Sequence, residues 1–255
     1  MRRTLSLAVA GAVLLGACGG STGEDAGRDR ELVVSAAASL ADAFPEIGRA
    51  FEAANPGVAV AFNFGPSDGL AGQIVEGAPV DVFVSASPAW MDAVAEGPGV
   101  IGRADVARNR LTVIVPAENP GQIERIEDLA RDGVKLVLAA EGVPAGDYAR
   151  EILAKAGIAE AALANLVSNE DDVRGVVAKV LAGDADAGIV YATDATPDAA
   201  AGIRAIPIPD DLNVVATYTA AVVGGSEQVD LAKRFVDFVL DEGRETLADH
   251  GFLPA

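Results

Sequence analysis

Four short segments combine small or hydroxyl-bearing residues with the expected start of a helix. They are residues 36–40 (AAASL), 65–69 (GPSDG), 142–146 (GVPAG) and 171–175 (DDVRG). Backbone N–H groups in the first turn of a helix lack an intrahelical partner and carry partial positive charge. Several helix starts that converge on one place would bind an anion without lysine or arginine. Each segment alone is also typical of an ordinary helix start in an α/β protein.

Residues 65–69 also match G-x-S-x-G, the nucleophile elbow of α/β hydrolases. Ser67 would be the nucleophile, and His250, which follows many aspartates, stands where the hydrolase chain order places the base. Ser67 followed by Asp68 is equally typical of a helix cap. His250 before Gly251 is typical of a helix end. An exported serine esterase is therefore the alternative to anion binding.

The composition excludes several classes of function. The 255 residues include 38 acidic and 19 basic side chains, a net charge of −19. So acidic a chain is poorly suited to bind nucleic acid. One histidine, His250, and one cysteine, Cys18, cannot form a His/Cys metal cluster. We expect no cofactor, no bare metal cation and no nucleic-acid partner.

The N-terminus has the pattern of an export signal. Arginines at positions 2 and 3 precede an apolar run over residues 5–15, which is too short for a permanent membrane anchor. Small residues then lead to Cys18, as in a bacterial lipobox, where the cysteine becomes the lipidated first residue of the mature protein. The sequence holds no second cysteine that could pair with it. An ordinary signal peptide with an incidental cysteine is the alternative.

The rest of the chain shows an alternating pattern. We expect a signal peptide at residues 1–17 and, at residues 18–30, the lipidated cysteine and a flexible tether rich in glycine, serine and charged residues. From residue 31, apolar β-like runs alternate with helical spacings, which predicts an α/β fold with mostly parallel sheets flanked by helices. Hinge strands near residues 111–115 and 214–223 would join two such sheets.

Individual elements follow from the same patterns. The predicted strands are residues 32–34, 58–62, 80–84, 111–115, 134–139, 187–191 and 213–223. The predicted helices are residues 40–51, which Pro45 bends or restarts, and residues 70–75, 89–94, 145–156, 173–182 and 229–240. Ser87 is the expected N-cap of the helix at residues 89–94, and Pro88 its first residue.

Five strings make the chain resemble the molybdate-binding proteins of bacterial molybdate ABC transporters. They are residues 36–43 (AAASLADA), 77–86 (GAPVDVFVSA), 143–149 (VPAGDYA), 170–175 (EDDVRG) and 188–194 (GIVYATD). The resemblance runs from about Leu32 to Pro254, nearly the whole mature chain.

The resemblance implies a two-lobed periplasmic-binding-protein fold of type II that closes on its ligand. Lobe 1 would comprise residues 31–112 and 222–255, and lobe 2 residues 113–221. The mature protein would be an exported monomer, held by Cys18 on the outer face of the cell membrane or on its periplasmic side. It would not be an enzyme. It would capture molybdate and tungstate and deliver them to a membrane permease with its ATPase.

By the same resemblance, the anion-binding positions are Ser39 and Ser67 in one lobe, and Ala145, Val173 and Tyr191 in the other. Serine and tyrosine offer hydroxyls, whereas alanine and valine offer backbone N–H groups. A site made only of donors suits molybdate, a tetrahedral dianion without a proton. It should disfavour hydrogen phosphate, whose proton needs an acceptor.

One departure from the family concerns the second segment. Many relatives have a serine-rich stretch where this chain has Pro66, Ser67, Asp68 and Gly69. Pro66 has no N–H to donate, and Asp68 brings a carboxylate close to the site. We expect Asp68 to cap its helix or to face solvent, because a carboxylate aimed inward would repel an anion.

Overall fold

The computed structural model describes residues 30–195 and 202–255. The predicted signal peptide, Cys18 and the tether up to residue 29 lie outside these residues. Over the described ranges, none of the helices is both long and apolar enough to pass through a bilayer.

Strands and helices alternate along most of the described chain. The strands are β1 (Arg30–Ala37), β2 (Val58–Gly65), β3 (Val82–Ser85), β4 (Val100–Pro116), β5 (Leu136–Ala139), β6 (Leu166–Glu170), β7 (Ala187–Tyr191), β8 (Ile203–Pro207) and β9 (Val215–Val223). The helices are α1 (Phe44–Ala54), α2 (Ser67–Val75), α3 (Pro88–Glu96), α4 (Pro144–Lys155), α5 (Ala159–Ala164), α6 (Val173–Leu181), α7 (Val229–Leu240) and α8 (Gly243–Asp249), with 3₁₀ turns η1 (Ala38–Leu40), η2 (Ile126–Ala130) and η3 (Ala192–Ala195).

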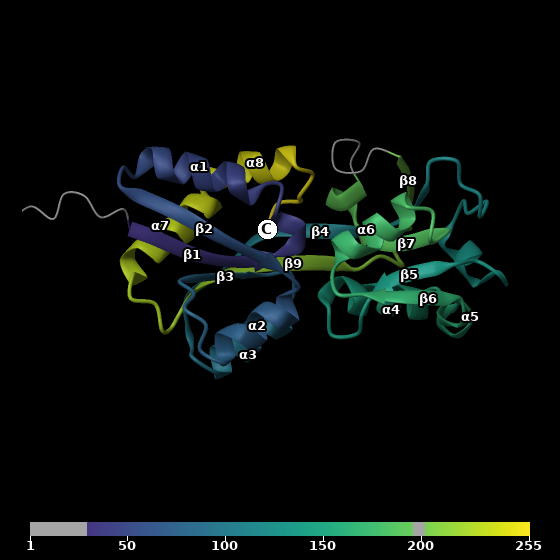
Figure 1. Ribbon diagram of the computed structural model, residues 1–255, viewed down its shortest axis with the longest axis horizontal. Coiled ribbons are helices and arrows are strands. Elements are labelled where there is room, and N and C mark those ends of the chain that lie inside the picture. The colour runs from purple at the N-terminus through teal and green to yellow at the C-terminus, as the bar shows by residue number, and fades with distance from the viewer. Residues whose placement is uncertain (1–29, 196–201) are drawn as a thin grey trace, which may run out of the picture.

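The elements form two lobes side by side, joined by long strands (Figure 1). In lobe 1, β1 lies between β2 and β3 and is parallel to both. In lobe 2, β5 lies between β6 and β7, again parallel. The long strands β4 and β9 are antiparallel to each other and connect the two groups. The predicted α/β fold with two lobes and connecting strands is confirmed.

Strand β4 changes partners along its length. Its residues 100–110 pair with β9, and residues 111–116 pair with β7 and β8. The sequence pattern predicts only residues 111–115 as a strand, because Arg103, Asp105, Arg108 and Arg110 interrupt the apolar run before them. Pairing with β9 keeps that charged stretch extended. The lobe division at residues 112/113 and 221/222 stays a prediction.

Helices cover the sheet of lobe 1 on both sides (Figure 1). On one side, Phe44 and Phe51 of α1, Phe62 of β2 and Phe235 of α7 pack ring against ring, with centroids 5.2 to 6.4 Å apart. Gly48 permits this packing, since a Cβ there would lie 2.6 Å from the Phe62 ring. On the other side, α2 and α3 bury a separate apolar cluster against β3 and β9. This packing fixes where β1, β2 and β3 end.

Most predicted elements agree with the structure, and the misses have a common cause. The bounds of β7 and α7 coincide with the prediction, and Ser87 is the N-cap of α3 with Pro88 as its first residue. Three elements, α5, β6 and β8, are not predicted by the sequence patterns. These elements are short and only partly buried: β6 and β8 lack a continuous apolar run, and the six residues of α5 are too few to show a helical period.

Candidate anion-binding site between the lobes

A small cavity lies between the lobes, where strands of both lobes end. Lobe 1 lines it with residues that follow β1, β2 and β3, and lobe 2 with residues that follow β5 and β6 and with the end of β7. The lining residues are Ala37, Ala38, Ser39, Gly65, Pro66, Ser67, Ala86, Val143, Pro144, Ala145, Asp172, Val173 and Tyr191. Ligands of open α/β sheets bind beyond the carboxyl ends of the strands, as here.

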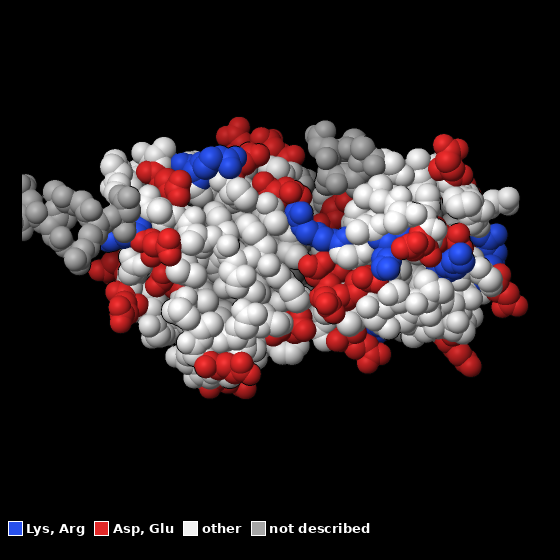
Figure 2. Space-filling view, in the orientation of Figure 1, with Lys and Arg blue, Asp and Glu red and all other residues white. Residues whose placement is uncertain are grey.

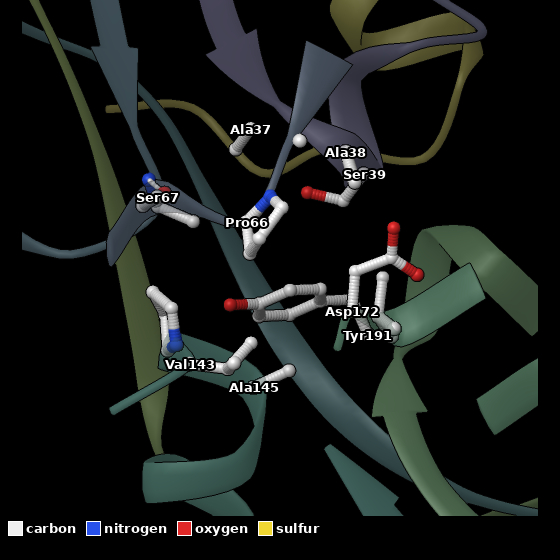
Figure 3. Close-up of a pocket in the computed structure, with 13 residues that line it drawn as sticks. Ala37, Ala38, Ser39, Pro66, Ser67, Val143, Ala145, Asp172 and Tyr191 are labelled. Carbon is white, nitrogen blue, oxygen red and sulfur yellow. Dashed lines mark hydrogen bonds between the residues drawn. The ribbon is translucent and has the colours of Figure 1, made fainter. Parts of the chain in front are cut away.

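All five residues expected to bind an anion line this cavity. Figure 3 labels four of them, Ser39, Ser67, Ala145 and Tyr191. Ser39 and Ser67 approach from lobe 1, and Ala145, Val173 and Tyr191 approach from lobe 2. Their exposed fractions lie between 1% and 6%. A ligand among them would therefore be held away from bulk water.

Ser39 lies in the 3₁₀ turn η1, which begins directly after β1. Its Oγ lies 2.7 Å from the hydroxyl oxygen of Tyr218, a buried residue of β9. The short turn brings the Ser39 hydroxyl from the end of a central strand to the edge of the cavity.

Ser67 is the first residue of α2, after the extended N-cap Pro66. Its Oγ accepts a hydrogen bond from the backbone N–H of Ala86 at 3.1 Å, so it caps the neighbouring chain and not its own helix. Of the two expected positions for Asp68, helix capping is not found, because α2 has no side-chain cap among the described residues. Asp68 is half-buried: it keeps some exposure to solvent, while its Oδ1 is buried without a hydrogen-bond partner among the described residues. Asp68 is not part of the cavity lining.

The starts of α4 and α6 form the lobe 2 wall. Ala145 is the second residue of α4 and Val173 the first of α6, positions whose N–H groups have no intrahelical partner. Asp172 caps α6 by accepting from the N–H of Gly175 at 2.9 Å. Gly146 allows α4 to begin against β5, because a Cβ there would lie 2.1 Å from the carbonyl oxygen of Ala140.

Tyr191, the last residue of β7, reaches into the cavity between residues of both lobes (Figure 3). Within the part of the chain that the structure describes, its buried hydroxyl has no hydrogen-bond partner. Burial raises the pKa of this hydroxyl well above its ordinary value, so it remains a protonated donor. A buried hydroxyl without a partner costs stability unless a ligand accepts from it.

The cavity holds little positive charge. Among the described lining residues, Asp172 alone is charged, and its carboxylate caps α6. Arg174 lies next to Val173 but reaches across to lobe 1, where it donates to the carbonyl of Ala38 at 3.1 Å and to Asp42 at 2.9 Å. Acidic side chains lie over both lobes on the face shown in Figure 2. Any attraction for an anion must therefore come from neutral donors inside the cavity.

Contacts across the cleft hold the lobes together. The indole N–H of Trp90 donates to the carbonyl of Gly142 at 2.8 Å, and the Tyr148 hydroxyl donates to the carbonyl of Ala86 at 3.2 Å. The Arg174 bonds cross the cleft as well. With the buried cavity between them, these contacts describe a closed arrangement of the lobes.

The structure does not join Ser67 to His250. His250 follows α8, its Nε2 lies 3.3 Å from Oε1 of Glu46, and Gly251 has a φ of 86°, as predicted for a helix end. The recorded partner of Ser67 Oγ is the Ala86 amide, and His250 lines a different pocket from Ser67. The structure thus shows no nucleophile–base pair at these two residues.

Several residues of the site carry no signal in the sequence. Tyr218 and Asn109, which lie behind Ser39, stand beside other polar residues within long strands, so nothing in the pattern distinguishes them. Trp90 and Tyr148 lie on helices whose patterns do not reveal that they face the opposite lobe. Only the packing of the two lobes assigns these residues to the site.

Two α/β lobes closed over a small, donor-lined cavity define a solute-binding protein. A family model described as "Bacterial extracellular solute-binding protein" matches residues 32–253. A Mycobacterium tuberculosis H37Rv protein named "Molybdate-binding protein ModA" is 40% identical over 225 residues, which cover 88% of this chain and 84% of the relative. The chain therefore belongs to the ModA family of bacterial extracellular solute-binding proteins.

Solved structures share the fold. The periplasmic molybdate-binding protein of Azotobacter vinelandii matches with a TM-score of 0.75 and 21% identity, over 88% of this chain and 99% of that one. The sulfate-binding protein SubI of Mycobacterium tuberculosis H37Rv matches with a TM-score of 0.77 and 18% identity, over 89% and 87%. The two neighbours are named for different anions, so this likeness concerns the fold and not the ligand.

Proposed function

We propose that this protein captures molybdate, and tungstate with it, in the cavity between its lobes. The observation that carries the proposal is the Tyr191 hydroxyl, which is buried, protonated and unpartnered among the described residues in a cavity lined by two serines and two helix starts. Such a cavity offers donors to an anion that carries no proton. The 40% identical relative named for molybdate supports this choice of anion.

The physical chemistry of the cavity favours a dianion despite the net charge of −19. A hydrogen bond to a charged acceptor contributes about 1.5–3 kcal/mol, and a closed cavity screens it little. Exposed carboxylates are screened by salt beyond roughly 8 Å. Oriented hydroxyl and N–H dipoles close to the ligand therefore outweigh the distant negative charge.

Calorimetric titration of residues 19–255 with molybdate, tungstate, sulfate and phosphate tests this function. We expect tight binding of molybdate and tungstate and weaker binding of sulfate and phosphate. Trp90, the one tryptophan in the sequence, lies at the lobe contact and provides a fluorescence signal for the same titrations. A folded sample that binds none of the four anions would refute the proposal.

Ligand-driven closure is the second part of the proposal. The anion contacts both lobes at once, so it stabilises the closed arrangement relative to an open one. The closed form would then present both lobes to a membrane permease with its ATPase. Small-angle scattering should show a smaller radius of gyration with molybdate than without it. Superimposable curves would count against closure.

The lipid anchor is the third part. Cys18 would carry the lipid that holds the protein outside the cytoplasm, as its place after the apolar N-terminal run suggests. The full-length protein should then fractionate with membranes, and Cys18→Ser should release it to the soluble fraction. Equal fractionation of both proteins would refute lipidation at Cys18.

A further inference from the structure

Behind Ser39 lies a buried polar network on the strands that join the lobes. Tyr218 of β9 is fully buried, Asn109 of β4 is 1% exposed, and Thr193 of η3 is 8% exposed. The Tyr218 hydroxyl lies 2.7 Å from Ser39 Oγ, and the Asn109 amide nitrogen lies 2.9 Å from Thr193 Oγ1 and 3.5 Å from the Tyr218 hydroxyl. The network thus links lobe 1, the joining strands and lobe 2.

The orientation of the Asn109 side chain determines which atoms of this network donate hydrogen bonds and which accept them. Its Oδ1 accepts a hydrogen bond from the backbone N–H of Arg110 at 2.9 Å, and an N–H can only donate. The amide nitrogen must therefore be the atom that faces Thr193 and Tyr218. Since that nitrogen also can only donate, the Tyr218 oxygen acts as its acceptor.

The Tyr218 proton then has one recorded acceptor among the described residues, the oxygen of Ser39. Burial raises the pKa of Tyr218, which keeps this proton in place. Ser39 Oγ, once it accepts from Tyr218, directs its own proton elsewhere. Ser39 borders the cavity between the lobes and also a second pocket beside Asp42 and Thr193. Its hydroxyl oxygen points toward the cavity (Figure 3), so the proton is available to an anion there. Ser67 is held in the same way, because its Oγ accepts from the Ala86 N–H.

We propose that Tyr218, oriented by Asn109, is a positioning residue that holds the Ser39 hydroxyl as a donor toward the anion and thereby disfavours anions that carry a proton. The proposal rests on the proposed function and deepens it. Without Tyr218, the Ser39 hydroxyl could rotate and present its lone pairs to a proton of the ligand. Selectivity against hydrogen phosphate would thus depend on a residue that does not touch the anion.

A double-mutant cycle on molybdate affinity tests this role. Tyr218→Phe removes the hydroxyl and keeps the ring, and Ser39→Ala removes the donor itself. We expect Tyr218→Phe to weaken molybdate binding about tenfold in the natural chain and less than about twofold in the Ser39→Ala background, because both changes remove the same contact. Equal losses in both backgrounds would show that Tyr218 acts only through general packing and would overturn the proposal.

A second pair of measurements uses the protonation of the ligand. Sulfate carries no proton at neutral pH and hydrogen phosphate carries one, so each is competed against molybdate with the natural chain and with Tyr218→Phe. We expect Tyr218→Phe to raise the affinity for phosphate relative to that for sulfate by about fivefold or more. In this variant the Ser39 oxygen is free to accept the proton of hydrogen phosphate. If the ratio of phosphate to sulfate affinity is unchanged, Tyr218 has no role in selectivity, even if the variant binds molybdate more weakly.

Asn109→Asp is an isosteric variant that should reverse the direction in which the hydrogen bonds of this network are donated. The carboxylate can only accept, so Tyr218 would donate to it, and Ser39 would donate to Tyr218 and turn its proton away from the anion. Molybdate affinity should fall at least as far as in Ser39→Ala. Unchanged affinity would contradict the inferred orientation of Asn109, and thermal unfolding shows whether this variant folds.

The two proposals can fail separately. If the natural chain binds no molybdate, the proposed function is refuted. If the natural chain binds molybdate and the losses from Tyr218→Phe and Ser39→Ala are additive, only the positioning role of Tyr218 is refuted.

Discussion

The two walls of the cavity offer donors by different physical means. The lobe 1 wall offers the side-chain hydroxyls of Ser39 and Ser67, which can rotate and which neighbouring donors hold in one direction. The lobe 2 wall offers the first N–H groups of α4 and α6, whose direction follows from the helix backbone. Tyr191 adds a hydroxyl whose position is set by the end of β7.

This difference predicts which substitutions remove a hydrogen-bond donor from each wall. A lobe 1 donor is lost through a change in the serine or in the group that orients it. A backbone donor at the start of α4 or α6 survives most side-chain substitutions, and it is lost only to proline or to a shift of the helix start. Four substitutions test the two walls and the residues around them, from the largest expected effect to the smallest, and a fifth serves as a matched control.

Asp194 is a buried carboxyl three residues after Tyr191, in lobe 2 but outside the cavity lining. It is 7% exposed, and its Oδ2 has no hydrogen-bond partner among the described residues. Burial raises its pKa to about 7, against the opposing effect of Arg174 and with Asp42 and Asp172 adding to the rise. The folded chain thus holds a proton that the unfolded chain has lost, so this group reduces stability as pH rises from about 4 to about 7.

We therefore expect Asp194→Asn to stabilise the fold by up to about 4 kcal/mol near pH 8, and by much less near pH 4.5, where the natural carboxyl is already protonated. Urea unfolding of both proteins at the two pH values measures this difference. A gain that does not depend on pH would show that the Asp194 carboxyl does not titrate in this range.

Val173→Pro tests the backbone donors of the lobe 2 wall. Proline is favoured as the first residue of a helix, and Asp172 before it is already extended, with φ −152° and ψ 177°. The substitution thus removes one N–H at little structural cost. Molybdate affinity should fall by about 1.5–3 kcal/mol, roughly ten- to hundredfold.

Val173→Ala is the matched control, because it trims the side chain and keeps the N–H. Calorimetry should give it nearly the natural affinity. Equal losses for the two variants would mean that the Val173 side chain matters and that its backbone N–H does not.

Tyr191→Phe tests the one side-chain donor of lobe 2. Affinity for molybdate should fall by about 1–2 kcal/mol through the loss of one donor. The ligand-free protein should lose no stability, because the hydroxyl has no partner among the described residues to give up. Titration calorimetry and ligand-free thermal unfolding give the two values. Unchanged affinity would remove Tyr191 from the site.

Trp90→Phe tests the contact between the walls. It removes the hydrogen bond to the Gly142 carbonyl, which stabilises only the closed arrangement. We expect a loss of about 1 kcal/mol in affinity, equal for molybdate and tungstate, because the indole does not touch the ligand. Calorimetry with both anions checks this. Losses that differ between the two anions would place Trp90 in the binding site itself.

Local patterns in the sequence predict much of this fold. The apolar run of β7 and the helical spacing of α7 define those elements to the residue. The four segments of small and hydroxyl residues at strand ends also identify most of the positions that line the cavity, because helix starts carry a local signature, whereas Ala86 and Tyr191 lie outside these segments. Conversely, the first half of β4 is hidden by its charged residues, and it is extended because β9 pairs with it.

The sequence by itself determined the α/β alternation and the segments that supply donors, because these depend on the identity and spacing of neighbouring residues. Only the tertiary structure decided which residues orient those donors. Tyr218 lies 179 positions from Ser39, and Asn109 lies 84 positions from Thr193. Such contacts arise when β4 and β9 pair and the lobes close, and the direction of a hydroxyl proton depends on every donor around it. The same holds for Asp68 and Asp194, whose environments depend on how the surrounding elements pack.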